Sequence, residues 1–325
     1  MPLRDDVYLL SNSEQSDFKD CRRRWWLRWV LDLVPRREEP FGPRALGTRV
    51  HAALAEYYGA VLDGMDEDSA RASATALLAK TAEEDRARLE ESDPPPAASD
   101  LKALADDVEL AGIMLEGYFE WLEETGADRY LVPVAAEHQR TAPLGEVRGT
   151  EFRLIELLDL KVRNEEEGSH SYMDHKTTDS FSRLTQTAHL DGQLKHYCLI
   201  DRLTGEEGLR ADGGTLNMLR RVKRTARAKP PFYARHTTRH NDETLRSHWM
   251  ALTSVAADIV DVLHRLDAGE DHRTACYPSP SKECSWKCDY FRVCGLLDDG
   301  TPEDWALAEF DVRGGLEGRY DVGAL

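Results

Sequence analysis

The chain has 325 residues, of which 41% are hydrophobic and 31% are charged, and its 60 acidic and 42 basic residues give a formal net charge of −18. This length allows one elaborated domain or two modest ones with a substantial core. The net charge excludes a protein that binds nucleic acid through a uniformly basic surface, and the apolar runs are too short for a membrane-spanning helix. The start, MPLRDDVYLL, lacks both the basic and the apolar part of a secretory signal, so we expect a soluble, cytoplasmic protein with no membrane partner.

The N-terminal third of the chain is predicted to be helical. Ser11 and Glu14 have capping-box spacing, and the helix that they begin turns Cys21 inward together with the aromatic residues around it. A second helix is predicted over residues 45–62. Residues 63–124 contain 18 acidic and 5 basic residues in two helical patterns that a proline-rich turn separates. This composition is typical of a solvated helical insertion.

After Gly126 the pattern changes to alternating strands and helices. Short apolar segments rich in β-branched and aromatic residues predict strands over residues 130–139, 152–162, 171–177, 213–219 and 231–237. Helices are predicted over residues 184–203 and 243–266. A helix inserted among strands predicts a mixed α/β core. The tail from Cys276 onward is irregular and rich in cysteine.

Two of the predicted strands carry carboxylates that face each other. If residues 152–162 and 171–177 form a hairpin around NEEEGSH, Asp159 lies directly opposite Asp174. Opposed carboxylates repel, so this register requires a cation between them. Lys176 projects from the same strand face as Asp174. Two carboxylates and an ammonium predict a Mg²⁺ or Mn²⁺ site suited to phosphodiester hydrolysis, and the alternative is a surface salt-bridge ladder.

Polar side chains recur on the helix that follows this hairpin. Gln193 and Tyr197 are one helical turn apart, and Gln186 and His189 lie near the same stripe. An ordinary amphipathic helix is the alternative explanation for this row. His51, on an upstream helix, is by itself most simply a buried core residue.

Taken in chain order, these motifs resemble the PD-(D/E)XK nucleases, and among them the RecB-like branch that includes CRISPR-associated and phage exonucleases. The resemblance rests on GTRVH ending at His51, LLDLK containing Asp159, DHK from Asp174 to Lys176, and QLKHY from Gln193 to Tyr197. It covers most of the chain from Ser11 to Cys294, apart from the acidic helices. It implies a restriction-endonuclease-like core, in which a mixed central sheet is flanked by helices.

The resemblance also implies roles for individual residues. The Mg²⁺ or Mn²⁺ ligands would be His51, Asp159, Asp174 and the backbone carbonyl of His175. Lys176 would be catalytic, and Gln193 and Tyr197 would support the site and contact DNA. Glu137 resembles an acidic position in the preceding strand. The family usually has a glycine three residues before the first metal aspartate, where this chain has Glu156.

Six cysteines in an intracellular chain favour metal or redox chemistry over disulfides. Cys284, Cys288 and Cys294 are so close in sequence that three thiolates there need a metal and a fourth ligand, for which Cys21 is the candidate. The same nuclease branch holds a 4Fe-4S cluster with one N-terminal cysteine and a C-terminal triplet, so the resemblance implies such a cluster as a structural staple. A structural Zn²⁺ is the alternative. Cys198 is predicted to be a small buried residue.

A basic segment interrupts the acidic sequence. Residues 219–240 contain eight Lys or Arg residues and no acidic residue, together with Phe232 and Tyr233. We predict that these cations bind phosphates and that the two aromatic rings stack on unpaired bases, whereas the alternative is a solvated loop. Arg22 to Arg24 form a smaller cluster that could also touch DNA. The predicted DNA-binding residues are Arg220, Arg221, Lys223, Arg224, Arg227 and Lys229.

These features predict a Mg²⁺- or Mn²⁺-dependent DNA exonuclease that acts on DNA ends or single strands in recombination, repair or replication. The expected organisation is an N-terminal helical region over residues 1–132, a nuclease core over 133–270 and a cluster-binding segment over 271–325. The alternative is a non-catalytic DNA-binding scaffold that retained the fold and the cluster, but the intact aspartates and lysine favour the enzyme. The sequence has no GxxxxGK[ST] loop, so any unwinding would need a helicase or recombination protein as partner, and a homo-oligomer is a candidate assembly.

Overall fold

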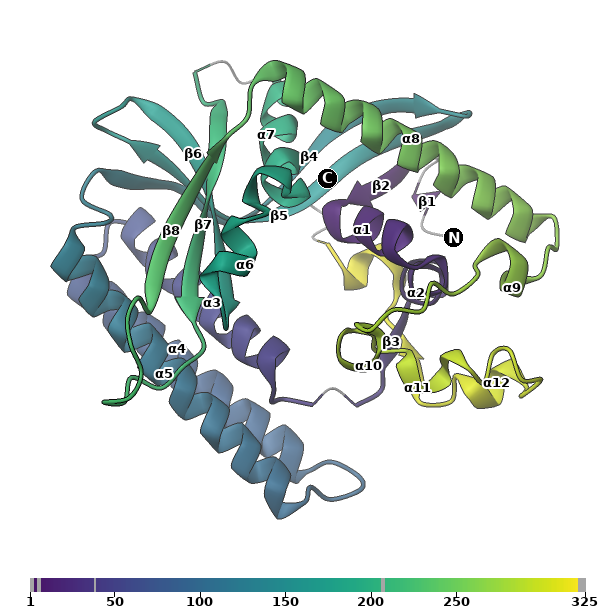
Figure 1. The fold of residues 1–325 in the computed structure, drawn as a ribbon, viewed down its shortest axis with the longest axis horizontal. Helices are drawn as coiled ribbons and strands as arrows, with labels where there is room; N and C mark the ends of the chain where they lie inside the picture. Colours follow the sequence, from purple (N-terminus) through teal and green to yellow (C-terminus); the bar gives the residue numbers. More distant parts are fainter. Residues whose placement is uncertain (1–2, 5–6, 38, 206–207, 321–325) are drawn as a thin grey trace.

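The computed structural model describes residues 3–4, 7–37, 39–205 and 208–320, and its centre is a mixed β-sheet flanked by helices (Figure 1). Within these residues the main sheet has seven strands. They are β1 (Leu3–Arg4), β2 (Val7–Ser11), β4 (Leu131–Val147), β5 (Thr150–Asn164), β6 (Ser169–Thr178), β7 (Ala211–Arg220) and β8 (Tyr233–Arg239). A small second sheet pairs β3 (Leu33–Pro35) with β9 (Phe310–Val312), which ties the two ends of the chain together.

Strand β5 organises the sheet because it has different partners along its length. One of its edges pairs with antiparallel β4 throughout. The other edge pairs first with β2, in parallel over Glu151–Ile155, and then with β6, antiparallel over Leu160–Asn164. Beyond that point β6 continues on β7 alone, in parallel, and β7 pairs with antiparallel β8. The sheet therefore opens between β2 and β6, over residues 156–159.

Helices cover both faces of this sheet. On one face, α3 to α5 form a core with residues from β5, β6 and β7, and on the other face α7 packs against the same strands. Helix α8 packs on α7 and joins a third core that includes the N-terminal and C-terminal segments. The helices of eight or more residues are α1 (Asn12–Asp20), α3 (Pro43–Leu62), α4 (Glu67–Glu90), α5 (Ala98–Thr125), α7 (Gly192–Thr204) and α8 (Asp242–Asp267).

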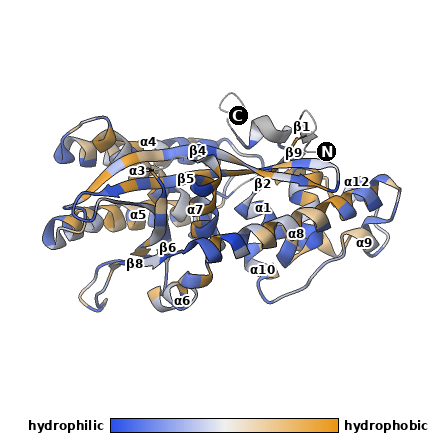
Figure 2. Ribbon diagram, turned by 90° about the horizontal axis from the view of Figure 1, so that it is seen from above, coloured by the Kyte–Doolittle hydropathy of each residue, from blue (hydrophilic) through white to orange (hydrophobic). Residues whose placement is uncertain are grey.

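Short helical turns fill the connections and the C-terminal segment, which lies beside α1 and α2 in Figure 1. They are α2 (Arg22–Trp25), the π-helix η1 (Trp26–Val30), α6 (Phe181–Thr185), the 3₁₀ turn η2 (Ala188–Leu190), α9 (His272–Ala275), α10 (Cys284–Lys287), α11 (Phe291–Cys294), α12 (Glu303–Ala306) and the 3₁₀ turn η3 (Gly315–Gly318). Figure 2 shows hydrophobic stretches along β2, β4 and β5. Among the described residues, no helix is both long and apolar enough to span a membrane.

The mixed α/β core and its main elements are confirmed. The acidic stretch forms α4 and α5, and the predicted helix over 45–62 is α3. Two other helices differ from the prediction. The first one breaks at Cys21, whose backbone is extended with φ −160°, and α2 then starts a new turn. The helix predicted over 184–203 begins only at Gly192, because Asp191 caps its first turn by accepting hydrogen bonds from the backbone N–H groups of Gln193 and Leu194.

Candidate active site

The candidate active site lies where β5 and β6 separate. Their ladder ends at the pair Leu160 and Met173, and the same register puts Asp159 opposite Asp174, as predicted. The backbone N–H of His175 donates a hydrogen bond to Asp159 Oδ2 at 2.8 Å. Because the N–H and C=O of one strand residue point to the same edge, the carbonyl of His175 also faces Asp159. An oxygen-rich pocket thus begins at the end of the ladder.

The backbone is irregular at Asp159. Leu158 packs with α7, whereas Leu160 packs with α3, although residues two apart in a regular strand face the same side. Across the ladder, Glu137 lies opposite Asp159 between two regular pairs and has a φ of 43°, a conformation that few residues other than glycine adopt. Backbone strain of this kind clusters at active sites and ligand-binding sites.

Lys176 is held by a chain of polar contacts that runs from β6 to α7 and back to β5. Its Nζ lies 2.7 Å from Asp174 Oδ2 and donates a hydrogen bond to Gln193 Oε1 at 2.9 Å. Gln193 Nε2 donates to the Tyr197 hydroxyl at 2.6 Å, and that hydroxyl donates to the carbonyl of Leu157 at 3.4 Å. The predicted pair Gln193 and Tyr197 therefore orients the lysine. Gln186 and His189 precede α7 and are exposed, so they do not belong to this row.

Burial sets the charge of these groups. Burial raises the pKa of Asp174, and the adjacent Lys176 partly opposes this effect. Burial also disfavours the charged form of Lys176, but the neighbouring carboxylates outweigh it and raise the lysine pKa, so the ammonium is protonated at neutral pH. Burial, with a contribution from Asp174, raises the pKa of Glu156 to about 8, and this side chain accepts a hydrogen bond from the backbone N–H of Asn12 at 3.0 Å. The neutral, hydrogen-bonded Glu156 thus fits at the position where the nucleases that this chain resembles usually have a glycine.

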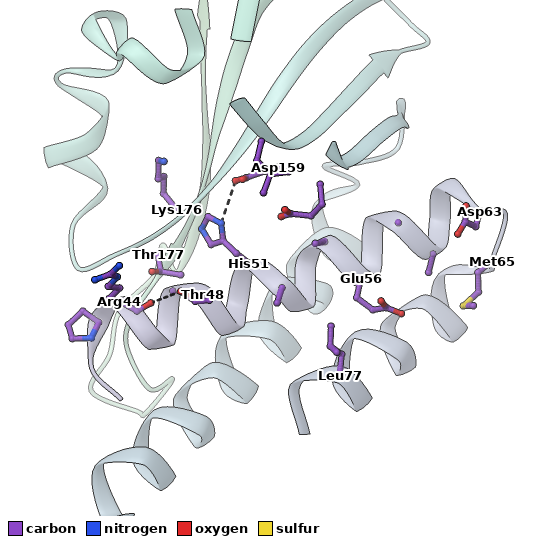
Figure 3. Close-up of a pocket in the computed structure, with 18 residues that line it drawn as sticks. Arg44, Thr48, His51, Glu56, Asp63, Met65, Leu77, Asp159, Lys176 and Thr177 are labelled. Carbon is purple, nitrogen blue, oxygen red and sulfur yellow. Dashed lines mark hydrogen bonds and ion pairs between the residues drawn. The ribbon is translucent and has the colours of Figure 1, made fainter. Parts of the chain in front are cut away.

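Helix α3 brings His51 to the pocket. Its Nδ1 lies 3.5 Å from Asp159 Oδ2, and Figure 3 shows the ring reaching from α3 toward that carboxylate. One turn earlier, Gly47 lets α3 approach β6 closely, since a Cβ at this position would lie 3.1 Å from Thr177 Oγ1. Burial and the charge of Lys176 lower the pKa of His51 to about 4. The imidazole is therefore neutral and has a lone pair for a cation.

These groups open into a cleft of about 1040 Å³ between α3 and the strands. The prediction did not include Arg44, which lines this cleft two helical turns before His51 (Figure 3). Helical periodicity from the histidine would have identified it, because residues seven apart share one face. The cleft residues that carry polar or charged side chains near the strand opening are Arg44, Thr48, His51, Glu137, Asp159, Lys176 and Thr177.

The pocket suits a hard divalent cation. Asp174 is 1% exposed, and Lys176 is the cation beside it, with Nζ 2.7 Å from Oδ2. Asp159 and the His175 carbonyl supply further oxygen atoms beside it. Among the described residues, no three His, Cys, Asp or Glu side chains already stand together at metal-binding spacing. A cation there would need oxygen ligands from the backbone as well as from side chains.

The basic segment, residues 219–240, differs from its prediction as an open DNA-binding surface. Lys223 pairs with Glu109 at 2.7 Å and Arg224 with Glu120 at 2.5 Å, so two of its cations lie on the acidic helix α5. Of four further side chains, two have partners, and two have none among the residues that the structure describes. Arg221 pairs with Asp179 at 2.9 Å, and Arg220 donates a hydrogen bond to the carbonyl of Lys229 at 3.0 Å. The side chains of Arg227 and Lys229 are exposed and have no partner within the described residues.

The aromatic part of that prediction is wrong for Tyr233. This residue is 7% exposed, and its hydroxyl donates a hydrogen bond to the carbonyl of Met114 at 3.0 Å, while Phe232 packs against the same core. The smaller cluster also has structural roles. Arg23 is 1% exposed and pairs with Asp298 at 2.7 Å, and Arg24 pairs with Asp17 at 2.9 Å.

The four cysteines predicted to share a metal converge from the two ends of the chain, and we call them the cysteine clip: Cys21, Cys284, Cys288 and Cys294. The Ser279 N–H lies 3.4 Å from Cys21 Sγ, and the Ser281 N–H lies 3.3 Å from Cys284 Sγ. Burial, with a further contribution from the thiols of Cys21 and Cys284, raises the pKa of Cys288 to about 11. Arg23 Nη1 donates to the carbonyl of Cys294 at 3.2 Å.

Four thiols at neighbouring positions fit a thiolate-bound metal. They do not yet stand at metal-binding spacing in the residues that the structure describes. The remaining two cysteines lie outside the clip. Cys276 and Cys198 are both fully buried in hydrophobic cores, as predicted for Cys198.

Comparisons with known proteins agree with this geometry. No curated protein is detectably similar to the chain in sequence. The model of the PD-(D/E)XK nuclease superfamily matches residues 9–295, a range that contains the whole cleft and all four clip cysteines. Because the match covers most of the sequence, the chain belongs to the PD-(D/E)XK nuclease superfamily, whose members are mostly nucleases that usually depend on Mg²⁺ or Mn²⁺.

Proposed function

We propose that the protein is a Mg²⁺- or Mn²⁺-dependent DNA exonuclease. The observation that carries the proposal is the buried Asp174, which lies opposite Asp159 and beside the tethered ammonium of Lys176. A salt-bridge ladder on the surface would not bury these groups. The choice of DNA ends or single strands, and of recombination, repair or replication as the setting, rests on the resemblance to RecB-like nucleases.

The residues at the cleft have different roles in the proposed reaction. His51, Asp159, Asp174 and the carbonyl of His175 would hold the cation, with Glu137 adjacent. A divalent cation bound there lowers the pKa of a bound water and stabilises negative charge on the phosphate. Lys176, protonated and fixed by Gln193 and Tyr197, offsets the charge that develops during hydrolysis. Arg44 adds a second positive charge at the cleft.

We further propose that the cysteine clip holds a structural 4Fe-4S cluster. The convergence of Cys21 with three thiols that lie 263 or more residues later supports a metal that staples the chain ends. The resemblance to the nuclease branch favours iron and sulfur over Zn²⁺. The segment 271–325 would then serve as the cluster-binding unit, beside a helical region over 1–132 and a nuclease core over 133–270.

A nuclease assay tests the first proposal. Purified protein is incubated with end-labelled single-stranded and blunt duplex DNA, with Mg²⁺, Mn²⁺ or a chelator. We expect metal-dependent release of nucleotides from DNA ends, and we expect Asp174→Ala and Lys176→Ala each to lower the rate by about 10³-fold or more while remaining folded. Full activity in either variant, or none in the wild type, would contradict the assignment, and inactive wild type that still binds DNA would support a scaffold instead.

Spectroscopy tests the cluster. Protein purified without oxygen is expected to be brown, with about four iron atoms per chain, as a cluster held by four thiolates requires. Cys21→Ala should lose the colour and the iron. A Cys198→Ala variant, which removes a thiol outside the clip, should keep the colour and serves as the control. One zinc per chain and no colour would show that the clip holds a tetrahedral Zn²⁺ and no iron-sulfur cluster.

A further inference from the structure

Two large aromatic side chains on the C-terminal segment face solvent. Trp286, in α10, is 72% exposed, and Phe291, at the start of α11, is 51% exposed. Arg292 follows Phe291 directly, and Lys282 precedes Trp286 by four residues; both cations are exposed and have no ion-pair partner in the described part of the chain, whereas Lys287 beside Trp286 pairs with Glu283 at 3.4 Å. Single exposed rings are common on protein surfaces, and what sets these two apart is that unpaired cations accompany them. We call Lys282, Trp286, Phe291 and Arg292 the aromatic platform.

The aromatic platform adjoins the cleft. Asp289 lies between the two aromatic residues in sequence, and Arg44 Nη1 contacts both of its carboxylate oxygens, at 3.1 and 3.2 Å. Arg44 in turn lines the cleft that contains Asp159 and Lys176. Through this ion pair the segment that carries α10 and α11 contacts the first turn of α3. A ligand on the platform would reach the candidate active site across Arg44.

We propose that the aromatic platform binds an unpaired DNA strand and guides it into the cleft, an inference that rests on the proposed nuclease function. Flat exposed rings stack on bases, and free cations beside them neutralise phosphates. Bases in a duplex are already stacked on each other, so the platform selects a single strand. The basic segment, residues 219–240, cannot do this, because Tyr233 is buried and most of its cations are already paired.

A third exposed ring shows what distinguishes the platform. Trp305, in α12, is 76% exposed, but its helix begins with the acidic residues Glu303 and Asp304. Carboxylates repel a phosphate backbone, so exposure of a ring without cations does not suit DNA. The carboxylates near Trp286 are already paired, Glu283 with Lys287 and Asp289 with Arg44. Glu303 and Asp304 have no ion-pair partner among the described residues, so Trp305 is a control with the same side chain and similar exposure but unpaired carboxylates beside it.

Binding assays with defined DNA test the platform. Affinities are measured for fluorescent dT20 and for a blunt 20-base-pair duplex, with Ca²⁺ in place of Mg²⁺ to prevent cleavage. We expect Trp286→Ala and Phe291→Ala each to weaken dT20 binding about 5- to 100-fold, the range found for loss of one stacking residue. Trp286→Phe should restore most of the affinity, because it keeps a stacking ring. Duplex binding should change little, and Trp305→Ala should bind dT20 like the wild type.

Trp286 lies between two clip cysteines, so each variant is checked for visible absorbance, iron content and melting temperature. Normal values with weakened dT20 binding support the platform. Normal dT20 binding by the Trp286→Ala, Phe291→Ala double variant overturns it, and so does equal loss with Trp305→Ala. The two proposals can fail separately. Wild type that cleaves DNA while the double variant binds normally disproves only the platform, and wild type that binds dT20 through Trp286 without cleaving disproves only the nuclease.

Discussion

The cleft and the cysteine clip each gather four chemically active groups, but they hold them in different ways. In the cleft, Asp159 on β5 accepts a hydrogen bond from a backbone N–H, and Lys176 on β6 is joined through Gln193 to Tyr197 on α7. In the clip, the cysteines lie on helix ends and four-residue turns. Their contacts with Ser279 and Ser281 are long, at 3.3 to 3.4 Å.

This difference indicates which site the protein builds in advance. In the cleft, side-chain hydrogen bonds from Lys176 to Gln193 and from Gln193 to Tyr197 hold the lysine without a cation. The clip has few hydrogen bonds of its own, and burial raises the pKa of the Cys288 thiol to about 11, so a metal that binds the thiolates would supply the stabilisation. Loss of metal should therefore affect activity at the cleft and folding at the clip.

The largest expected effect is loss of a clip ligand. Cys288→Ser removes one thiolate, and because metal binding contributes directly to folding, we expect the free energy of unfolding to fall by about 5 kcal/mol or more. The apparent melting temperature measured by circular dichroism should drop by about 10 °C or more. A Cys276→Ser variant controls for a change of sulfur to oxygen outside the clip. An unchanged melting temperature in Cys288→Ser would show that the clip is preorganised like the cleft.

An intermediate effect is expected for His51→Ala in the cleft. Loss of a neutral imidazole ligand should lower kcat/KM about 100-fold at limiting Mg²⁺, equivalent to about 2.7 kcal/mol, and saturating metal should recover part of this loss. The melting temperature should stay within about 2 °C of wild type, because the ring is partly exposed and the fold does not need the cation. Titration of activity against Mg²⁺ measures the shift. A variant that unfolds, or one with unchanged metal dependence, would argue against a ligand role for His51.

The smallest effect concerns the approach of α3 to β6. Gly47→Ala puts a Cβ 3.1 Å from Thr177 Oγ1, so the helix must move by a few tenths of an ångström and carry His51 with it. We expect about a 5-fold fall in kcat, together with a gain in stability of up to about 1 kcal/mol, since alanine favours helix over glycine.

Adding Thr177→Ala to Gly47→Ala removes the obstructing hydroxyl and should restore the activity to that of Thr177→Ala alone. Kinetics and thermal melts on the two single variants and the double variant measure this coupling. Equal and additive losses would mean that the contact does not position the helix.

Much of the site could be predicted because its residues are close in sequence. The hairpin around NEEEGSH fixes the register by symmetry about its turn, so Asp159 faces Asp174 whatever surrounds them. Spacing of four on a helix likewise joins Gln193 to Tyr197. The placement of α3 and α7 on opposite faces of the strands came only from the structure.

The prediction that depended on the charge of a segment was the one that the structure changed most. A run of eight cations over 219–240 favours a phosphate-binding surface in sequence, but a sum of charges does not say where their partners lie. Lys223 and Arg224 meet carboxylates of α5 that are more than a hundred residues earlier. The basic segment and the acidic helices are therefore neighbours that partly neutralise each other.

The sequence by itself determined the fold class, the carboxylate and lysine motif and the four-cysteine pattern, because local periodicity and fixed spacing encode them. Only the tertiary structure decided that Glu156 is buried as a neutral side chain, that Glu137 and Asp159 share an irregular stretch of backbone, and that Trp286 is exposed while Tyr233 is buried. These outcomes depend on desolvation and on partners distant in sequence, and burial is a property of the assembled fold rather than of any segment.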